Sequence, residues 1–207
     1  MKKTHLFSML LVALLLSSCY AYRASYSVSL ASVEKPKDFS KQYGQFEISS
    51  FKEGDVSKYC YSDSLIDIVW NVGATQFDFE LKNKTNHTIK INWDDISYVD
   101  CDGKAGRVLH KGILLLNRNE AQAPLSIPRG AKISDVLIPV DNIIQPSGAY
   151  SGWQYKTLIP SFYQTAKARE ENASSYIGKN LTIMMPILIE GVQNDYTFVF
   201  SVDKLLK

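Results

Sequence analysis

The stretch TQFDFELKN, residues 75–83, decides the fold of this chain. Phe77, Phe79 and Leu81 alternate with charged residues, so the apolar pattern repeats every two positions. That period places apolar side chains on one face of a β-strand and charged side chains on the other. Because one face is polar, the strand is predicted to belong to an antiparallel sheet that is half exposed to water.

The same alternation lies on both sides of this stretch. It occurs in SLIDIVWNV, residues 64–72, and again in HTIKINW, residues 87–93. The residues between the last two segments, NKTN at 83–86, are typical of turns. The strands at 75–83 and 87–93 are therefore predicted to form a hairpin.

Further strands are predicted toward the C-terminus. The pair Asp102-Gly103 favours a tight turn and a second hairpin. Residues 132–140 predict one more strand, and residues 180–190 and 195–206 predict a final pair joined by GVQN. Pro186 cannot donate a backbone hydrogen bond, so its strand is expected at a sheet edge or a bulge.

Residues 145–178 interrupt the strand pattern. Good helix formers occur in a row only near 160–176, between Pro160 and Gly178, which predicts one short helix. About nine short strands with little helix predict an all-β fold, an antiparallel β-sandwich with one short helical insertion. The run FDFELKNKTNHTIKINWDDISYVDCDG, residues 77–103, resembles bacterial secreted Ig-like domains, and this resemblance implies an Ig-like sandwich.

The N-terminus has the composition of a targeting segment. Lys2 and Lys3 precede an apolar run over residues 6–16, which is shorter than the roughly 20 residues needed to span a bilayer. This pattern predicts a signal peptide over residues 1–18. An ordinary signal peptide with a chance cysteine is the alternative to the lipid attachment signal described next.

Leu16-Ser17-Ser18-Cys19 resembles the bacterial lipoprotein signal. The resemblance implies cleavage before Cys19, a thioether-linked diacylglyceryl group and an N-acyl chain such as palmitate. At about 0.8 kcal/mol per buried methylene, more than one chain gives stable anchoring. No Asp follows Cys19, which favours the outer membrane. Whether the protein faces the periplasm or the cell surface stays open.

These signals divide the chain into three parts. Residues 1–18 are the predicted signal peptide, residues 19–42 the lipidated N-terminus and tether, and residues 43–207 the β-sandwich. Lys2 and Lys3 are the only charged residues of the signal peptide, so 21 basic and 21 acidic residues remain after cleavage. A chain without net charge or basic runs gives no reason to expect nucleic acid as a partner.

Two cysteines remain if Cys19 carries lipid. An envelope location is oxidising, so Cys60 and Cys101 are disulfide candidates. A bridge closing a loop of about forty residues would contribute roughly 4 kcal/mol in the chain-entropy model. Two separate buried thiols are the alternative.

Catalytic and metal signatures are absent from the sequence. His87 and His110 lack the spacing of a zinc site, and no GxSxG, SxxK or glycine-rich phosphate loop occurs. The acidic residues at 94, 95, 100 and 102 are interpreted as turn residues, with a calcium site or a carboxylate-dependent hydrolase as alternatives. No catalytic residue, metal site or cofactor is predicted.

Aromatic residues give candidates for ligand contact. Trp70 and Trp93 share their strand face with apolar residues and are expected in the core. Trp153 lies in a Gly/Ser loop with Tyr150 and Tyr155, where these rings could stack on a sugar. The alternative is that Trp153 pins its own loop to the sheet.

A modification site is also suggested by sequence. Asp63-Ser64-Leu65 resembles the short O-glycosylation signal of Bacteroidota, which makes Ser64 a candidate acceptor.

The anchor, the strands and the missing signatures predict a function class. We expect a noncatalytic lipoprotein that acts as a binding or accessory subunit of an envelope protein assembly. A carbohydrate- or envelope-polymer-binding module is the first alternative, and a carboxylate-dependent hydrolase is the second. The expected partners are the membrane, through lipid on Cys19, an envelope protein and a glycan.

Overall fold

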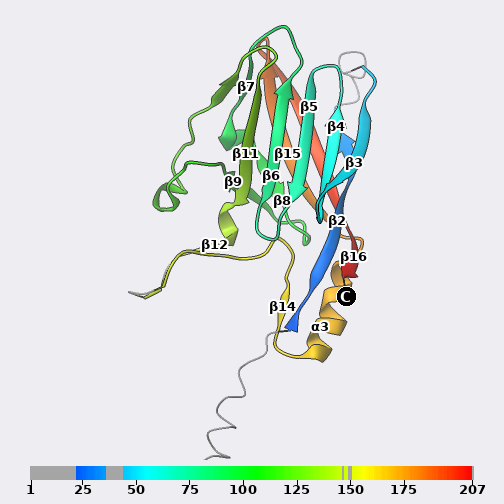
Figure 1. Cartoon of the computed structure of the whole chain (residues 1–207). Helices are drawn as coiled ribbons and strands as arrows, with labels where there is room; N and C mark the ends of the chain where they lie inside the picture. The colour runs from blue at the N-terminus through cyan, green and yellow to red at the C-terminus, as the bar shows by residue number, and fades with distance from the viewer. Residues whose placement is uncertain (1–21, 36–43, 146, 149–150, 207) are drawn as a thin grey trace, which may run out of the picture.

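The computed structural model describes residues 22–35, 44–145, 147–148 and 151–206. They form an all-β structure of two packed antiparallel sheets with one short α-helix (Figure 1). The strands are β1 (Tyr22–Arg23), β2 (Ser25–Glu34), β3 (Glu47–Glu53), β4 (Val56–Ser62), β5 (Ile66–Val72), β6 (Phe77–Asn83), β7 (Ile89–Ile91), β8 (Ser97–Val99), β9 (Ala105–Leu109), β10 (Leu125–Ile127), β11 (Lys132–Pro139), β12 (Ile143–Ile144), β13 (Gln154–Tyr155), β14 (Phe162–Tyr163), β15 (Asn180–Ile189) and β16 (Val192–Leu206). The helix is α3 (Ala166–Ala173), and short 3-10 turns are η2 (Trp93–Asp95), η3 (Leu115–Asn117), η4 (Val140–Asn142) and η5 (Ser174–Tyr176).

Two sheets make up the sandwich. Sheet I has the order β3-β4-β5-β6-β11. Sheet II runs from β2 through β16 to β15, whose far side pairs with both β7 and β8, and these continue to β10 and β9. In Figure 1 the orange and red strands of sheet II lie behind the cyan and green strands of sheet I.

The two sheets are joined along one side. Strand β9 pairs with β8 of sheet II, and its last two residues, Val108 and Leu109, pair with Pro139 and Ile138 of β11 in sheet I. On the other side, the hydroxyl of Tyr59 donates to the backbone oxygen of Val28. The sandwich is therefore nearly closed, which leaves its ends as the open parts of the structure.

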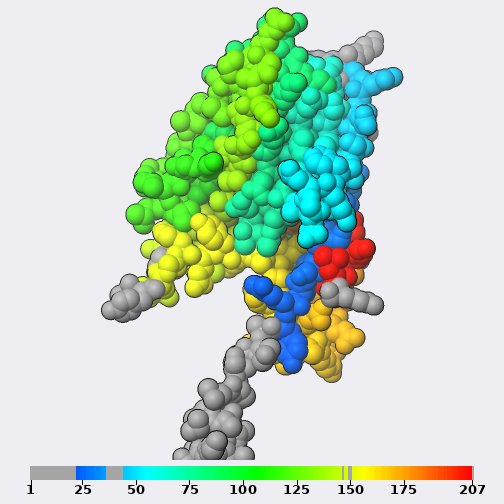
Figure 2. All heavy atoms as spheres, viewed as in Figure 1, coloured from blue at the N-terminus to red at the C-terminus, as the bar shows by residue number. Residues whose placement is uncertain are grey.

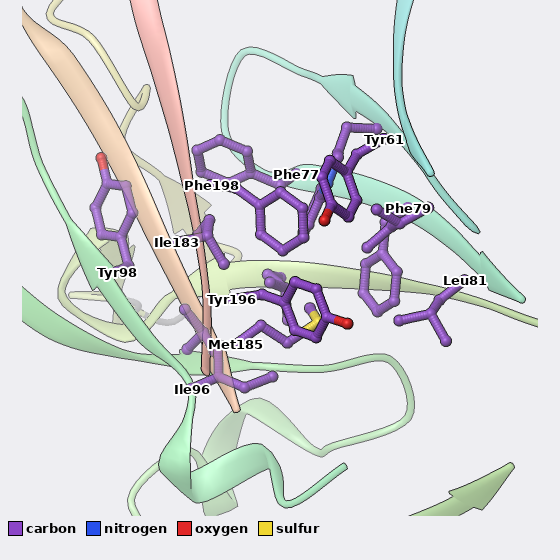
Figure 3. Packing of buried hydrophobic residues seen from close by; sticks show 14 of the residues in the cluster. Tyr61, Phe77, Phe79, Leu81, Ile96, Tyr98, Ile183, Met185, Tyr196 and Phe198 are labelled. Carbon is purple, nitrogen blue, oxygen red and sulfur yellow. The ribbon is translucent and has the colours of Figure 1, made fainter. Parts of the chain in front are cut away.

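The core lies between the sheets and is rich in aromatic rings (Figure 3). Trp70 is fully buried, and its ring lies 5.0 Å from Phe198 and 5.2 Å from Phe79, measured between centroids. Fully burying an apolar side chain of this kind stabilises a fold by about 1.5–3 kcal/mol. Trp93 is also buried, so the prediction that both tryptophans belong to the core is confirmed.

The predicted hairpin of residues 75–83 and 87–93 is wrong. Strand β6 pairs with β5 and β11 in sheet I, whereas β7 pairs with β15 and β10 in sheet II. The turn residues between them carry the chain across the sandwich. Asn83 holds this crossing: it is fully buried, and its side-chain amide donates to the backbone oxygens of His87, Ile127 and Pro128.

Two other predicted hairpins are confirmed. Strands β8 and β9 pair across the turn at Asp102-Gly103. Strands β15 and β16 pair across a two-residue turn at Glu190-Gly191, where both residues have positive φ, as the tight turns that suit hairpins require. The predicted connection GVQN is wrong, because residues 192–194 already pair within β16. On the side of β15 away from β16, residues 182–184 pair with β8 and residues 187–189 pair with β7. Pro186 lies in the gap between these two paired segments.

The single short helix is also confirmed. In α3 the hydroxyl of Thr165 accepts a hydrogen bond from the backbone N–H of Ala168, which caps the helix start. The expected boundary at residue 43 needs correction, because β2 pairs with β16 from Ser25 to Glu34 and belongs to the sandwich. No helix of the described residues is long and apolar enough to cross a membrane.

The expected disulfide is not formed. Cys60 and Cys101 are both free thiols. Cys60 alternates with the buried Tyr61 in β4 and so faces away from the core on sheet I. Cys101 follows β8 on sheet II and packs against the core. Cys60 therefore lies on the outer face of sheet I, whereas Cys101 lies on sheet II at the core, and the two thiols do not meet.

Candidate binding site

Two of the predicted site residues meet at one cavity. Cys101 and Tyr155 both line a cavity of about 470 Å³ beside the β8–β9 turn, which we call the hairpin pocket. It lies between that turn and the segment 155–162, which covers the lower end of the sandwich (yellow in Figure 2). Cys19 and Tyr150 lie outside the described residues.

Tyr98 is the most deeply buried aromatic residue among those that line the hairpin pocket. It is 4% exposed, and its hydroxyl has no hydrogen-bond partner among the described residues. Figure 3 shows this hydroxyl pointing away from the other labelled rings of the core. Burial raises the pKa of Tyr98 above its ordinary value, and the nearby Cys101 and Asp100 add to the effect. The hydroxyl therefore stays neutral and keeps both a donor and an acceptor for a ligand.

Cys101 lies beside this hydroxyl but does not behave as a nucleophile. Burial raises the pKa of its thiol to about 11, although Lys179 acts in the opposite direction. The thiolate is the reactive form of cysteine, and at neutral pH very little of it is present. Cys101 therefore contributes a small apolar wall to the pocket.

The carboxylates of the pocket are already engaged. Asp141 pairs with Lys104 at 2.6 Å, and Asp102 pairs with Lys179 at 2.8 Å. Asp100 accepts backbone hydrogen bonds from Asp102 and Lys104, each at 2.9 Å, and so shapes the β8–β9 turn. These contacts confirm the interpretation of Asp100 and Asp102 as turn residues.

The other two members of the acidic cluster point elsewhere. Asp94 pairs with Arg107 at 2.8 Å and accepts from the backbone N–H of Gln122, while Asp95 accepts from Asn92. Burial acts to raise the pKa of Asp94, but the bonds from Gln122 and Arg107 outweigh it and leave that pKa below its ordinary value. Within the described residues, no group of three or more His, Cys, Asp or Glu side chains is placed to hold a metal ion.

Aromatic side chains form the rim of the pocket. Tyr155 and Phe162 are 40% and 55% exposed, and Tyr176 is half-buried beneath the ammonium group of Lys179. Exposed rings around a polar floor are suited to stacking on the apolar face of a ligand. Phe162 and Tyr176 were missed from sequence, because only the pairing of β14 with β1 and the turn η5 after α3 bring them here.

Trp153 does not line the hairpin pocket. It is half-buried, and the guanidinium of Arg118 lies over its ring at 5.2 Å. This contact attaches the loop of Trp153 to the segment after η3. The alternative expected the ring to attach its loop to the sheet, so the role is similar but the contact differs. Of the predicted ligand-contact residues that the structure describes, Tyr155 lines the hairpin pocket and Trp153 does not.

The remaining candidates lie apart from the pocket. His87 contacts Glu190 at 3.0 Å, whereas His110 stacks on Trp93 with ring centroids 4.2 Å apart, so the two histidines share no site. Ser64 is exposed in the turn between β4 and β5, where it stays a predicted modification site.

Asp63, next to Ser64, is at the centre of a network that sequence did not predict. Its side chain is fully buried and pairs with Lys35 at 3.0 Å. The same oxygen accepts from the hydroxyls of Tyr61 at 2.8 Å and Tyr196 at 3.1 Å. The ammonium of Lys35 also lies over the rings of Tyr61 and Phe46, at 4.9 and 5.2 Å. This network ties the end of β2 to both sheets.

Comparison with known proteins gives little. No family model and no curated protein matches the chain. A solved X-ray structure of a Northeast Structural Genomics Consortium target aligns with 87% of this chain and 84% of its own at 10% identity, with a TM-score of 0.25. At that score the alignment supports no conclusion about fold or function.

Proposed function

We propose that the protein is a noncatalytic binding or accessory subunit of a bacterial envelope assembly, held at the outer membrane by lipid on Cys19. The observation that carries the proposal is the state of the groups in the hairpin pocket. Tyr98 is neutral, the Cys101 thiol is protonated, and Asp102 and Asp141 are held in ion pairs. Such groups recognise a ligand, whereas acid, base or nucleophilic catalysis needs groups poised to change protonation state.

The entry of the chain into the fold is compatible with an anchor. Only Tyr20 and Ala21 separate Cys19 from β1, and β1 pairs with β14 beside the pocket rim. Three residue steps extend at most about 10 Å. Lipid on Cys19 would therefore hold this end of the sandwich close to the bilayer.

An exposed apolar loop around η3 supports a protein partner. Leu114 and Leu116, around η3, are 69% and 76% exposed, more than any other large apolar residue described. Neighbouring exposed leucines in a loop are a feature of protein contact surfaces. We assign the partner contact to this loop.

The test is an affinity pull-down of the tagged, lipidated protein from its native membranes in mild detergent. We expect a partner protein in stoichiometric amount and a diacylglyceryl mass on Cys19. The double variant Leu114→Ser/Leu116→Ser should lose the partner, while Leu188→Ser, an exposed apolar residue on β15, should keep it. Recovery of the protein alone with an unmodified Cys19 would contradict the proposal.

A second function is favoured by the pocket rim. Tyr155, Phe162 and Tyr176 line the same pocket as Tyr98, and exposed rings of this kind suit stacking on a sugar ring. If the protein binds an envelope glycan, Tyr155→Ala should weaken its retention on isolated peptidoglycan, and Trp153→Ala should not. Equal retention of both variants and the unaltered protein would remove this candidate.

A further inference from the structure

A second cavity lies on the other side of the segment 157–162. Its volume is about 900 Å³, within the usual size of ligand pockets, and we call it the end cleft. The cleft opens between the sheets, with Val28 and Leu181 from sheet II and Tyr59 and Val72 from sheet I in its walls. Arg23 of β1 also lines it, so it lies where the chain enters the fold.

The interior of the end cleft is apolar. Leu181, Leu158 and Ile159 are at most 6% exposed and lie in its lining together with Val28 and Val72. An aliphatic lining of this kind favours a hydrocarbon chain, because transfer of the chain out of water is favourable and the chain needs no hydrogen bonds.

Three polar side chains in the interior of the end cleft are already paired. The Tyr59 hydroxyl donates to Val28, the Tyr26 hydroxyl donates to the backbone oxygen of Pro160 at 2.9 Å, and the Asn71 amide donates to Asp78 at 3.2 Å. Among the described residues, none of the buried polar atoms left without a partner lines this cleft. The end cleft thus differs from the hairpin pocket, where the Tyr98 hydroxyl is unpaired.

The rim of the end cleft is cationic. Arg23, Lys52 and Lys204 line it and are exposed, and Asp55 is its one acidic residue. None of the three cations forms an ion pair with a described residue, so their charge is not neutralised by the protein. An apolar interior with a cationic rim is complementary to an amphiphile with an anionic head group.

We propose that the end cleft binds an anionic phospholipid of the membrane, with an acyl chain between the sheets and the phosphate among Arg23, Lys52 and Lys204. The membrane is the expected source because β1, which lines the cleft, is joined to Cys19 by two residues. The source of the lipid rests on the proposed anchor at Cys19, but the cleft itself needs neither the protein partner nor the hairpin pocket.

Native mass spectrometry of the lipidated protein, extracted from its membranes in mild detergent, tests this proposal. We expect one noncovalently bound phosphatidylglycerol or other anionic phospholipid per protein. Lys52→Glu and Lys204→Glu should each lower the bound fraction about tenfold, as expected for loss of a charge-assisted bond. Both lysines are exposed and form no ion pair with a described residue, so the variants should fold. Lys90→Glu, an exposed cation on β7 away from both cavities, should bind normally.

Several outcomes would overturn the proposal. They are absence of bound phospholipid, equal binding of zwitterionic lipid, and equal binding by the Lys52→Glu and Lys90→Glu proteins. A phospholipid found only on the Cys19→Ser protein would mean that the protein's own acyl chain fills the cleft, which also contradicts the proposal. The same spectra report the mass of Cys19, so a missing anchor is distinguished from an empty cleft.

Discussion

Asp63 and Tyr98 are both buried polar side chains, but their surroundings differ. The carboxylate of Asp63 accepts two backbone hydrogen bonds from the turn that follows it, at 2.8 and 2.9 Å, and bonds from Tyr61, Tyr196 and Lys35. The hydroxyl of Tyr98 has no partner among the described residues and lies at a cavity. A buried polar group without a partner costs about 1–3 kcal/mol.

The two side chains therefore have different roles, Asp63 in holding the fold and Tyr98 at the hairpin pocket. The Asp63 network satisfies its polar atoms within the protein, so its role is to hold β2 and the β4–β5 turn in place. The Tyr98 hydroxyl has no such partner among the described residues, and Tyr98 is one of the residues that line the hairpin pocket. A buried polar group without a partner beside a pocket favours a binding role over a purely structural one.

The largest effect is expected from Asp63→Ala. The change leaves the Lys35 ammonium and two tyrosine hydroxyls buried without their shared acceptor. Removing one partner of a buried ion pair destabilises by about 3–5 kcal/mol. Urea unfolding should show this loss. Asp67→Ala, which removes a partly exposed pair with Lys84, is the control and should cost about 1 kcal/mol or less. Equal losses would contradict the central role of Asp63.

The second prediction concerns the reactivity of Cys101. Burial raises its pKa from about 9 to about 11, so its thiolate is rarer by about 100-fold at neutral pH. Maleimide labelling of the folded protein, followed by peptide mass spectrometry, should find Cys101 modified about 100-fold more slowly than after unfolding in urea. Fast labelling of the native protein would show that the thiol is activated, and the hairpin pocket would then need a catalytic interpretation.

A smaller effect is expected from acid. The pKa of Asp94 is lowered in the folded state, so its pairing contributes stability above its unfolded pKa of about 3.9 and loses it as the pH falls through the lower folded value. The Asp94 side chain is partly exposed, which limits the contribution to roughly 0.5–1 kcal/mol. Asp94→Asn should therefore be less stable at pH 6 by that amount and should lose less stability between pH 4 and pH 2. An identical acid slope in both proteins would contradict the pairing with Arg107.

Local patterns predicted the strands but not all of their partners. Alternation in residues 66–72 and 77–83 identified β5 and β6 because each strand carries its own polar face. The turn at residues 83–86 did not reveal that the chain crosses to the other sheet, because that crossing depends on Asn83 bonding to Ile127 and Pro128, more than forty positions away.

The binding residues were harder to predict for the same reason. Tyr155 was a candidate from its loop, and it does reach the hairpin pocket. Tyr98 has the pattern of an ordinary core residue, and only the cavity beside β8 shows that its hydroxyl is unpaired. The cysteine prediction was wrong because strand parity, which places Cys60 on the outer face of sheet I, was not combined with the sheet to which Cys101 belongs.

The central claim is that the buried Tyr98 hydroxyl has no partner within the fold, and a matched pair of variants tests it directly. Tyr98 and Tyr196 are both at most 4% exposed, but only the Tyr196 hydroxyl bonds to Asp63. In urea unfolding without ligand, Tyr196→Phe should cost about 1–2 kcal/mol, whereas Tyr98→Phe removes a buried hydroxyl without a described partner and should raise the free energy of unfolding by about 1 kcal/mol or more. If Tyr98→Phe costs as much as Tyr196→Phe, the Tyr98 hydroxyl is bonded within the fold and the account is contradicted.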